Sequence, residues 1–184
     1  LEKTIAHYSV GDDKFTVKES LLETIAAFED GFKFDDGYGD MDTMIWMVSL
    51  AILCDVEQVD FQRITTIIKR DRANDKLLNT LIQSQQPDWN NSYAGYIQEH
   101  PYASTYNINK VRDIPYYLDK VWYQGHSDSY WHNSHKNNKV NLYFGYWAWE
   151  IAALVKINGW DDSSLKDQKY YPYDAVHWNE GMVV

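Results

Sequence analysis

The chain has 184 residues, of which 45% are hydrophobic and 24% charged, with only 4 Pro and 9 Gly. This composition excludes a disordered or collagen-like protein, and the length suits one domain with its own hydrophobic core. The formal net charge of -10 argues against binding to nucleic acid or to an anionic membrane, because both need a basic surface. The single cysteine, Cys54, excludes an internal disulfide framework and a cysteine-rich zinc module.

Helical patterns begin at the first residue and continue through the first third of the chain. Leu1, Ile5 and Tyr8 have helical spacing, and an amphipathic helix is expected over Thr16–Phe34. Met41–Cys54 is apolar on nearly every side, which indicates a central helix packed by others, and it is too short to span a bilayer.

Further helices are predicted up to the C-terminal end. The stripe at 61–68 is amphipathic, and Asn74 or Asp75 is expected to cap a helix that carries the leucines at 77–81. The later candidates begin with a weak segment at Tyr93–Gln98 and a helix over Asn109–Tyr123, with Pro115 near its start or at a kink. They continue with a helix over Tyr143–Asn158 that Gly159 ends, and with a short helix at 163–167 that Asp161 or Asp162 caps. No segment alternates like a strand, so we predict an all-α fold, a single domain of about seven to nine helices.

The negative charge is concentrated near the start of the chain. Residues 1–42 contain eleven acidic residues and four lysines, a net charge of -7, and the remaining 142 residues hold only -3. The densest stretch, Glu29–Asp42, has six acidic residues against Lys33. Two interpretations stay open here: a solvated loop that aids solubility, or an acidic surface that steers a basic partner.

Three histidines form the first candidate for chemistry. His126, His132 and His135 lie within ten residues, and the last two have a spacing that places both rings on one face of a helix. A catalytic zinc site needs three such ligands and an open position. The segment is rich in Ser, Asn and Gly and has no HExxH-like motif, so we favour a polar loop anchored by Trp131.

Glu150 is the second candidate, because it shares a helical face with Tyr146 and Trp147. A carboxylate among aromatic rings must be hydrogen-bonded or paired. We predict a structural carboxylate that accepts from Tyr, Trp or backbone donors, and the alternative is a general acid or base with a raised pKa.

The remaining motifs give no catalytic residue. Residues 116–149 hold eleven of the 29 aromatic side chains, and core packing is a more natural use for them than stacking on sugars or bases. GxGxxG, GxxxxGK[ST] and GxSxG motifs are absent, and Cys54 lies in an apolar helix where thiols are inert. We therefore predict no catalytic, cofactor or metal site.

The segment Gly145–Asp174, GYWAWEIAALVKINGWDDSSLKDQKYYPYD, resembles the C-terminal domain of the PoNi-type immunity proteins. Further matching pieces are YYLDKVWY at Tyr116–Tyr123, WHNSHK at Trp131–Lys136 and IWMVSLAIL at Ile45–Leu53. HYSVGDD at His7–Asp13 is similar to the junction that precedes this domain. The resemblance implies that residues 1–12 end a preceding helical region and that residues 13–184 form an all-α immunity-type C-terminal domain.

The resemblance also implies a function without catalysis or cofactors. Such proteins bind a cognate polymorphic toxin, typically a DNase of a contact-dependent or type VI delivery system, and block it in the cytoplasm of the producing cell. The shared residues expected to define the fold are Trp122, Tyr123, Gly145, Tyr146, Trp147, Glu150, Tyr171, Pro172 and Tyr173. They are not expected to form the toxin-binding surface.

A DNase and its DNA channel are basic, so the acidic residues near the start of the chain are candidate toxin contacts. Our first candidates are Asp35, Asp36, Asp40 and Asp42, followed by Asp12, Asp13, Glu29 and Asp30. Two alternatives remain: a metal-dependent hydrolase that uses His126, His132, His135 and Glu150, and a helical ligand-binding or scaffold module with a cavity lined by Trp122, Trp147 and Trp149.

Overall fold

The sequence patterns predict helices. In the computed structural model, the described residues form helices and connecting segments, and no strand occurs among them. These residues are 1–31, 38–71, 75–90, 101–137, 139 and 143–178, and the side chains of 38–40 are also left undescribed. Nine α-helical segments and five short 3-10 or π segments lie within these ranges. The all-α prediction is therefore confirmed.

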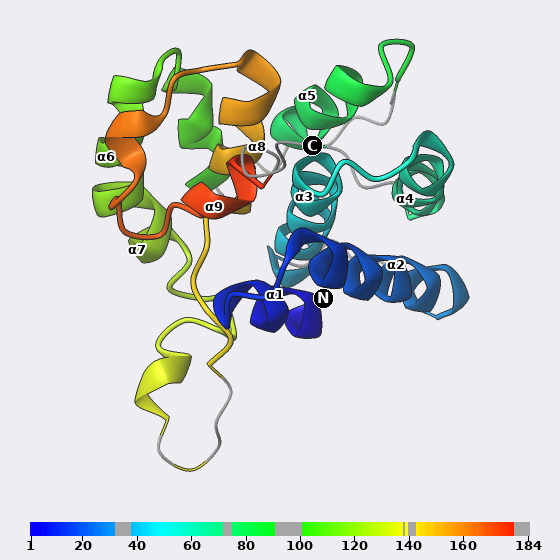
Figure 1. The fold of residues 1–184 in the computed structure, drawn as a ribbon, viewed down its shortest axis with the longest axis horizontal. Coiled ribbons are helices and arrows are strands. Elements are labelled where there is room, and N and C mark those ends of the chain that lie inside the picture. Colours follow the sequence, from blue (N-terminus) through cyan, green and yellow to red (C-terminus); the bar gives the residue numbers. More distant parts are fainter. Residues whose placement is uncertain (32–37, 72–74, 91–100, 138, 140–142, 179–184) are drawn as a thin grey trace.

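The first half of the chain forms five successive α-helices, and most segments of the second half are short (Figure 1). The first five helices are α1 (Glu2–Ser9), α2 (Lys14–Asp30), α3 (Tyr38–Leu53), α4 (Gln58–Arg70) and α5 (Lys76–Gln85). The later α-helices are α6 (Ile114–Tyr116), α7 (Tyr123–Gly125), α8 (Trp149–Asn158) and α9 (Tyr173–Val176). The 3-10 segments are Pro101–Asn107, Val111–Asp113, Ser134–Lys136 and Ser163–Leu165, and a π segment spans Tyr117–Trp122 between α6 and α7.

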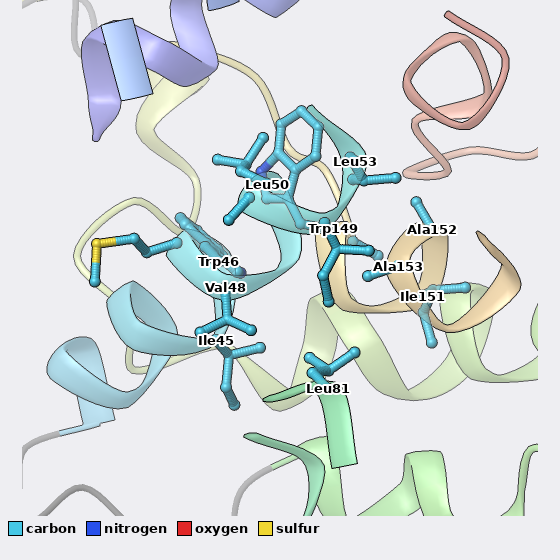
Figure 2. Packing of buried hydrophobic residues seen from close by; sticks show 14 of the residues in the cluster. Ile45, Trp46, Val48, Leu50, Leu53, Leu81, Trp149, Ile151, Ala152 and Ala153 are labelled. Carbon is cyan, nitrogen blue, oxygen red and sulfur yellow. The ribbon is translucent and has the colours of Figure 1, made fainter. Parts of the chain in front are cut away.

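Helix α3 is the centre of the core, as its continuous apolar pattern predicts. It packs against α2, α4 and α5 and most extensively against α8 (Figure 1). Figure 2 shows apolar side chains of α3 facing Ile151, Ala152 and Ala153 of α8, with Leu81 of α5 next to them. The small side chains at 152 and 153 allow the two helices to approach closely, and every apolar side chain from Met44 to Leu53 is buried.

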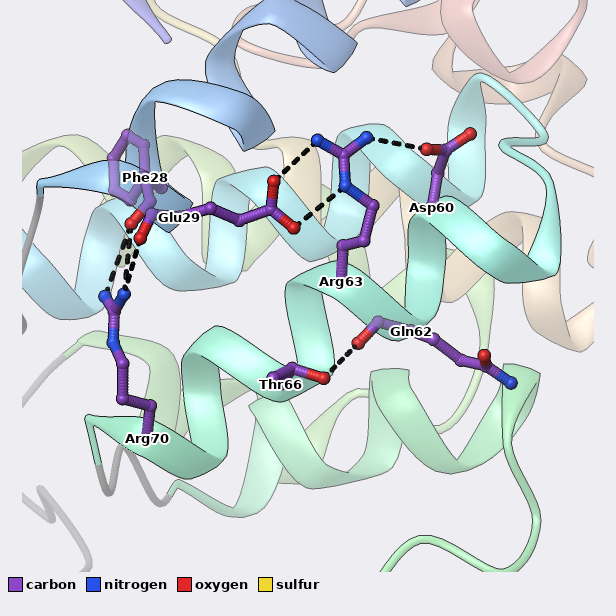
Figure 3. Close-up of polar contacts among 7 residues, drawn as sticks. All are labelled: Phe28, Glu29, Asp60, Gln62, Arg63, Thr66 and Arg70. Carbon is purple, nitrogen blue, oxygen red and sulfur yellow. Dashed lines mark hydrogen bonds and ion pairs between the residues drawn. The ribbon is translucent and has the colours of Figure 1, made fainter.

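Ion pairs join α2 to α4 (Figure 3). The Arg63 guanidinium donates to both carboxylate oxygens of Glu29, at 2.9 and 2.7 Å, and to Asp60 at 2.8 Å. Arg70 donates to the backbone carbonyls of Phe28 and Glu29 at the end of α2. These carbonyls have no partner within the helix, so Arg70 completes the C-terminal end of α2 and fixes its position on α4.

Several predicted helix ends agree with the structure, and Asp75 caps α5 as predicted by accepting from the Leu77 and Leu78 amides. Helix α2, predicted to begin at Thr16, begins at Lys14, where Asp13 caps it by accepting from the Thr16 amide at 2.8 Å. Pro115 stands in the first turn of α6, and Gly159 ends α8 with a φ of 60°. Asp161, rather than Asp162, accepts from the Ser163 amide. The predicted segment Tyr93–Gln98 lies outside the described residues.

The prediction of a helix over Tyr143–Asn158 is wrong in its first six residues. Helix α8 begins only at Trp149, and the preceding segment is irregular. Gly145 has a φ of +109°, and the Ala148 amide donates to the carbonyl of Tyr170 at 2.8 Å instead of to a carbonyl one turn before it. Ser9 also donates to the carbonyl of Phe144. Contacts with distant segments therefore replace the local helix that the pattern favours.

Candidate functional site

The acidic candidates that the structure describes lie in different environments. Asp35 and Asp36 lie outside the described residues, as does the side chain of Asp40. Asp12 is half-buried, and its carboxylate lies 2.6 Å from Nδ1 of His7. Asp42 is only 2% exposed. Its burial removes Asp42 from the acidic surface that the sequence suggests.

Asp42 belongs to a buried polar cluster, which we define as Asp42, Tyr102, Tyr117, His126, Ser129 and Glu150. The Tyr102 hydroxyl donates to Oδ1 of Asp42 at 2.9 Å, and the Ser129 hydroxyl donates to Oδ2 at 3.1 Å. Nε2 of His126 lies 3.4 Å from Oδ1, while its Nδ1 donates to the carbonyl of Trp122 at 2.6 Å. Burial lowers the pKa of His126, but the hydrogen bond and charge of Asp42 outweigh it and leave this pKa raised.

Glu150 is the second carboxylate of the buried polar cluster, and it has no exposed area. The Tyr117 hydroxyl donates to its Oε1 at 3.2 Å, which confirms the predicted tyrosine donor. Burial raises the pKa of Glu150 to about 7, against the opposing influence of His126 and Tyr117. Burial and the nearby carboxylates also raise the pKa values of Tyr102 and Tyr117. Hydrogen-bonded and fully enclosed, Glu150 joins α8 to the π segment.

The histidines do not come together as a metal site. His126 lies in the buried polar cluster, His132 packs on the Tyr123 ring with centroids 4.2 Å apart, and Nδ1 of His135 lies 2.8 Å from the Tyr146 hydroxyl. Within the described ranges, no group of three or more His, Cys, Asp or Glu side chains is arranged to hold a metal ion. Cys54 is buried, which raises the pKa of its thiol to about 12, in agreement with the expected inert cysteine.

Helix α2 presents an acidic face to solvent, which we call the α2 outer face and define as Phe15, Glu19, Glu23 and Asp30. These residues lie opposite the buried positions of the helix and are all exposed. Among the residues that the structure describes, Glu23 is the member of this face that contacts a lysine, Lys3 of α1 at 2.6 Å, and that pair is itself well exposed.

The lysines of α2 point away from the α2 outer face. Lys14 contacts Asp55, and Lys18 contacts Glu57, both on the connection between α3 and α4. Glu29 is likewise engaged by Arg63. The acidic residues of the first third are therefore divided: Glu23 and Glu29 pair with cations of neighbouring helices, whereas Glu19 and Asp30 of the α2 outer face contact no cation among the described residues.

The large aromatic residues fill the core, as predicted. Trp122, Trp131 and Trp149 are fully buried, and Trp122 stacks on Trp131 with ring centroids 5.5 Å apart. Of the three tryptophans that the ligand-binding alternative places on a cavity wall, Trp122 and Trp149 are therefore enclosed in the core, whereas Trp147 is half-buried and lines an open hollow.

The residues expected to define the fold occupy two environments. Trp122, Gly145, Glu150, Tyr171 and Pro172 are buried. Tyr123, Tyr146, Trp147 and Tyr173 are half-buried and reach the surface beside open hollows.

One of these hollows, which we call the tyrosine groove, has a volume of about 510 Å³. Its walls include Tyr123, Tyr143, Tyr146, Tyr170, Lys136 and Lys169. A second hollow of about 420 Å³ continues from it, because Tyr143, Tyr146, Lys169 and Tyr170 line both. Neither Lys136 nor Lys169 is among the predicted site residues, although each lies in a segment that carries the resemblance, WHNSHK and LKDQKYY.

The described helices also bear on membrane association. None of them combines the length and the apolar character needed to cross a bilayer.

In the residues that the structure describes, the geometry defines a helical protein in which buried charges hold segments together and the outer face of α2 carries exposed acidic residues. Comparison with protein families assigns it more closely. The family described as PoNe immunity protein (PoNi), N-terminal, matches residues 1–66, and PoNe immunity proteins (PoNi), C-terminal, matches residues 73–175. The chain therefore belongs to the PoNi family of immunity proteins, which has an immunity function against a polymorphic nuclease toxin.

The two family matches divide the chain between residues 66 and 73. The boundary that we predict at residue 13 remains a prediction. Contacts across it include the ion pair of Lys3 with Glu23 and the hydrogen bonds of Thr4 on α1 with Ser20 and Thr24 on α2.

A solved structure supports the fold assignment. The crystal structure of protein PA2201 from Pseudomonas aeruginosa matches with a TM-score of 0.68 and 17% sequence identity, over 96% of this chain and 71% of that chain. At this identity the match shows a shared fold. A search of curated proteins gives no match.

Proposed function

We propose that this protein neutralises a DNase toxin by binding it in the cytoplasm, without catalysis of its own. The toxin would be delivered by a contact-dependent or type VI system. Membership of the PoNi family is the observation that carries this proposal. An immunity protein acts by occupying its toxin.

The α2 outer face is the surface that we propose for the first contact with the toxin. A DNase needs a basic channel for DNA, so an acidic surface attracts it and competes with the charge of the substrate. Asp12 and Asp13 precede this face, and the segment with Asp35, Asp36 and Asp40 follows it in the sequence. Asp42 is left out because it is buried.

Co-expression with the toxin tests the immunity function. The toxin is taken as the product of the neighbouring reading frame, since toxin and immunity genes normally form a pair. Cells that express both proteins should survive, whereas cells that express the toxin alone should die. Continued killing in the presence of well-folded protein would contradict the proposal.

Association kinetics test the acidic surface. A variant with Asp12→Asn, Asp13→Asn, Glu19→Gln and Asp30→Asn loses four negative charges, and Asn at position 13 can still cap α2. We expect its association rate at low salt to fall about tenfold or more, with a weaker salt dependence and a smaller change in dissociation.

The matched control neutralises four exposed acidic residues elsewhere, Asp88, Asp119, Asp128 and Asp161. It changes the net charge equally and should slow association much less. If both variants slow association to the same extent, the net charge acts as a whole and the α2 outer face is only solvated surface.

A further inference from the structure

We propose that the tyrosine groove binds an acidic segment of the toxin and forms a second contact surface; this inference rests on the proposed toxin partner. The groove is formed by described residues from four places in the chain: Tyr123 near the end of the helical stretch, Lys136, Tyr143 with Tyr146, and Lys169 with Tyr170. No charged group of the buried polar cluster lines it. It is therefore a separate feature with its own chemistry.

The charge of the tyrosine groove is opposite to that of the chain. The sequence has 27 acidic residues against 17 basic ones, yet the described residues lining this hollow include Lys136, Lys169 and His135 and no carboxylate. Both lysines are exposed. Ammonium groups form strong, short hydrogen bonds with carboxylates, and tyrosine hydroxyls donate to them as well. The groove therefore fits an Asp or Glu side chain of a partner.

The walls of the tyrosine groove are held in place before any partner arrives. Tyr170 stacks on Tyr123 with centroids 5.2 Å apart and planes 5° from parallel. The Tyr123 hydroxyl donates to Oδ1 of Asn133 at 3.2 Å and accepts from the Asn133 amide at 3.3 Å. The Tyr146 hydroxyl accepts from the His135 amide, and Lys169 Nζ lies 4.5 Å from the centre of the Tyr170 ring. Side chains that are already fixed lose little entropy on binding, which favours affinity.

The backbone of the tyrosine groove is unusual as well. Tyr170 has a φ of +69° and Asn133 a φ of +60°, and these are two of the three described non-glycine residues with positive φ. A left-handed conformation is unfavourable for a large residue and persists where the surroundings impose it, often at binding sites. Here it places the Tyr170 ring against Tyr123 and its carbonyl against the Ala148 amide.

The chemistry of the groove favours a polypeptide as its occupant. Tyrosine is enriched at the energetic centres of protein–protein interfaces, where its ring packs and its hydroxyl bonds. Nucleic acid would have to approach a chain whose net charge is -10. A nuclease, in contrast, commonly holds its catalytic metal ions through Asp and Glu side chains, so it carries clustered carboxylates of the required kind.

Charge reversal in the groove tests the inference. The double variant Lys136→Glu/Lys169→Glu is compared with Lys110→Glu/Lys120→Glu, which reverses two exposed lysines outside the groove. Binding to the purified product of the neighbouring toxin gene is measured by biolayer interferometry, and circular dichroism checks the fold. The groove variant should bind at least about tenfold more weakly, mainly through faster dissociation, and the control should change less than about threefold.

A second variant keeps the test independent of charge. Tyr143 is 51% exposed, so Tyr143→Ala removes a groove wall without opening the core, and it should speed dissociation severalfold. If both groove variants bind the toxin like the control, the inference fails while the immunity function stands. If the wild-type protein forms no complex with the toxin, both proposals fail.

A nucleic-acid occupant is tested with a 12-nucleotide single-stranded DNA. If the wild-type protein binds this oligonucleotide and Lys136→Glu/Lys169→Glu does not, the groove is a nucleic-acid site and the inference is overturned. Binding of the toxin alone, lost in the groove variants, supports it.

Discussion

Glu150 is the group whose titration should control the stability of this protein around neutral pH. Burial raises its pKa from the ordinary 4.5 to about 7, against the opposing influence of His126 and the Tyr117 hydroxyl. In the unfolded chain the carboxyl regains its ordinary pKa, so the folded protein holds the proton more tightly. The resulting stabilisation is complete below pH 4.5 and is lost as the pH rises through about 7.

The size of the effect follows from this difference. A rise from 4.5 to about 7 corresponds to about 3 kcal/mol of unfolding free energy, of which about 2 to 3 kcal/mol falls between pH 5 and pH 8. Of the groups that face Glu150, His126 acts in the same direction, because its pKa is also raised. Tyr102 and Tyr117 keep their protons over this range, since their pKa values lie well above 10. Asp42 of α3 also acts on Glu150, because its negative charge raises the pKa of the Glu150 carboxyl further.

Glu150→Gln removes this titration and keeps the shape of the side chain. Urea unfolding, followed by tryptophan fluorescence, should show the wild-type protein losing about 2 to 3 kcal/mol between pH 5 and pH 8 and the variant losing much less. The variant should therefore be the more stable protein at pH 8. Glu19→Gln, on the exposed face of α2, is the control and should follow the wild type. If the unfolding free energies of the wild type and of Glu150→Gln fall by the same amount between pH 5 and pH 8, the reasoning is refuted.

Two further substitutions test the backbone and the α2 outer face. Gly145→Ala should lower the unfolding free energy by about 2 kcal/mol or more, because φ is +109° and a Cβ atom would lie 2.2 Å from Ser9 Oγ and 2.4 Å from Trp147 Nε1. Gly31→Ala, where a Cβ atom meets nothing within 4 Å, should change the unfolding free energy by less than about 0.5 kcal/mol. Equal losses of unfolding free energy in the two variants would contradict this explanation. Phe15→Ala should speed toxin dissociation about tenfold with little effect on association, because Phe15 is 70% exposed on the α2 outer face and offers an apolar anchor. Tyr116→Ala, 71% exposed elsewhere, is the control, and an unchanged dissociation rate for Phe15→Ala would remove Phe15 from the interface.

Local signals were sufficient to predict most of the helices. The capping residues Asp13, Asp75 and Gly159 act within a few residues of their own helix ends, so the sequence pattern contains the information. The segment before α8 differs because its apolar pattern favours a helix while its hydrogen-bond partners are far away in the chain. The Ala148 amide bonds to Tyr170, and the Phe144 carbonyl bonds to Ser9. Such tertiary contacts override local propensity, and a single sequence does not reveal them.

The candidate site was predictable only in part. The acidic character of the first third is evident from counting, but the inward direction of Asp42 depends on Tyr102, His126 and Ser129, which lie at least 60 residues away. The tyrosine groove is harder still to foresee. Its lysines at 136 and 169 are unremarkable in the sequence and meet only because the segments that carry them fold onto the same tyrosines.

The buried position of Asp42 links the two family regions of the chain. Asp42 comes from the region matched by the N-terminal family, and its described hydrogen-bonding partners Tyr102 and Ser129 come from the region matched by the C-terminal family. A buried carboxylate without such partners is strongly destabilising, so α3 can occupy this position only when the later segments supply their hydroxyls and the His126 ring. The same requirement aligns α3 with α8, which carries Glu150 of the same cluster. The acidic residues near the start of the chain therefore have two separate roles, because one of them joins the two regions inside the protein while those of the α2 outer face remain on the surface.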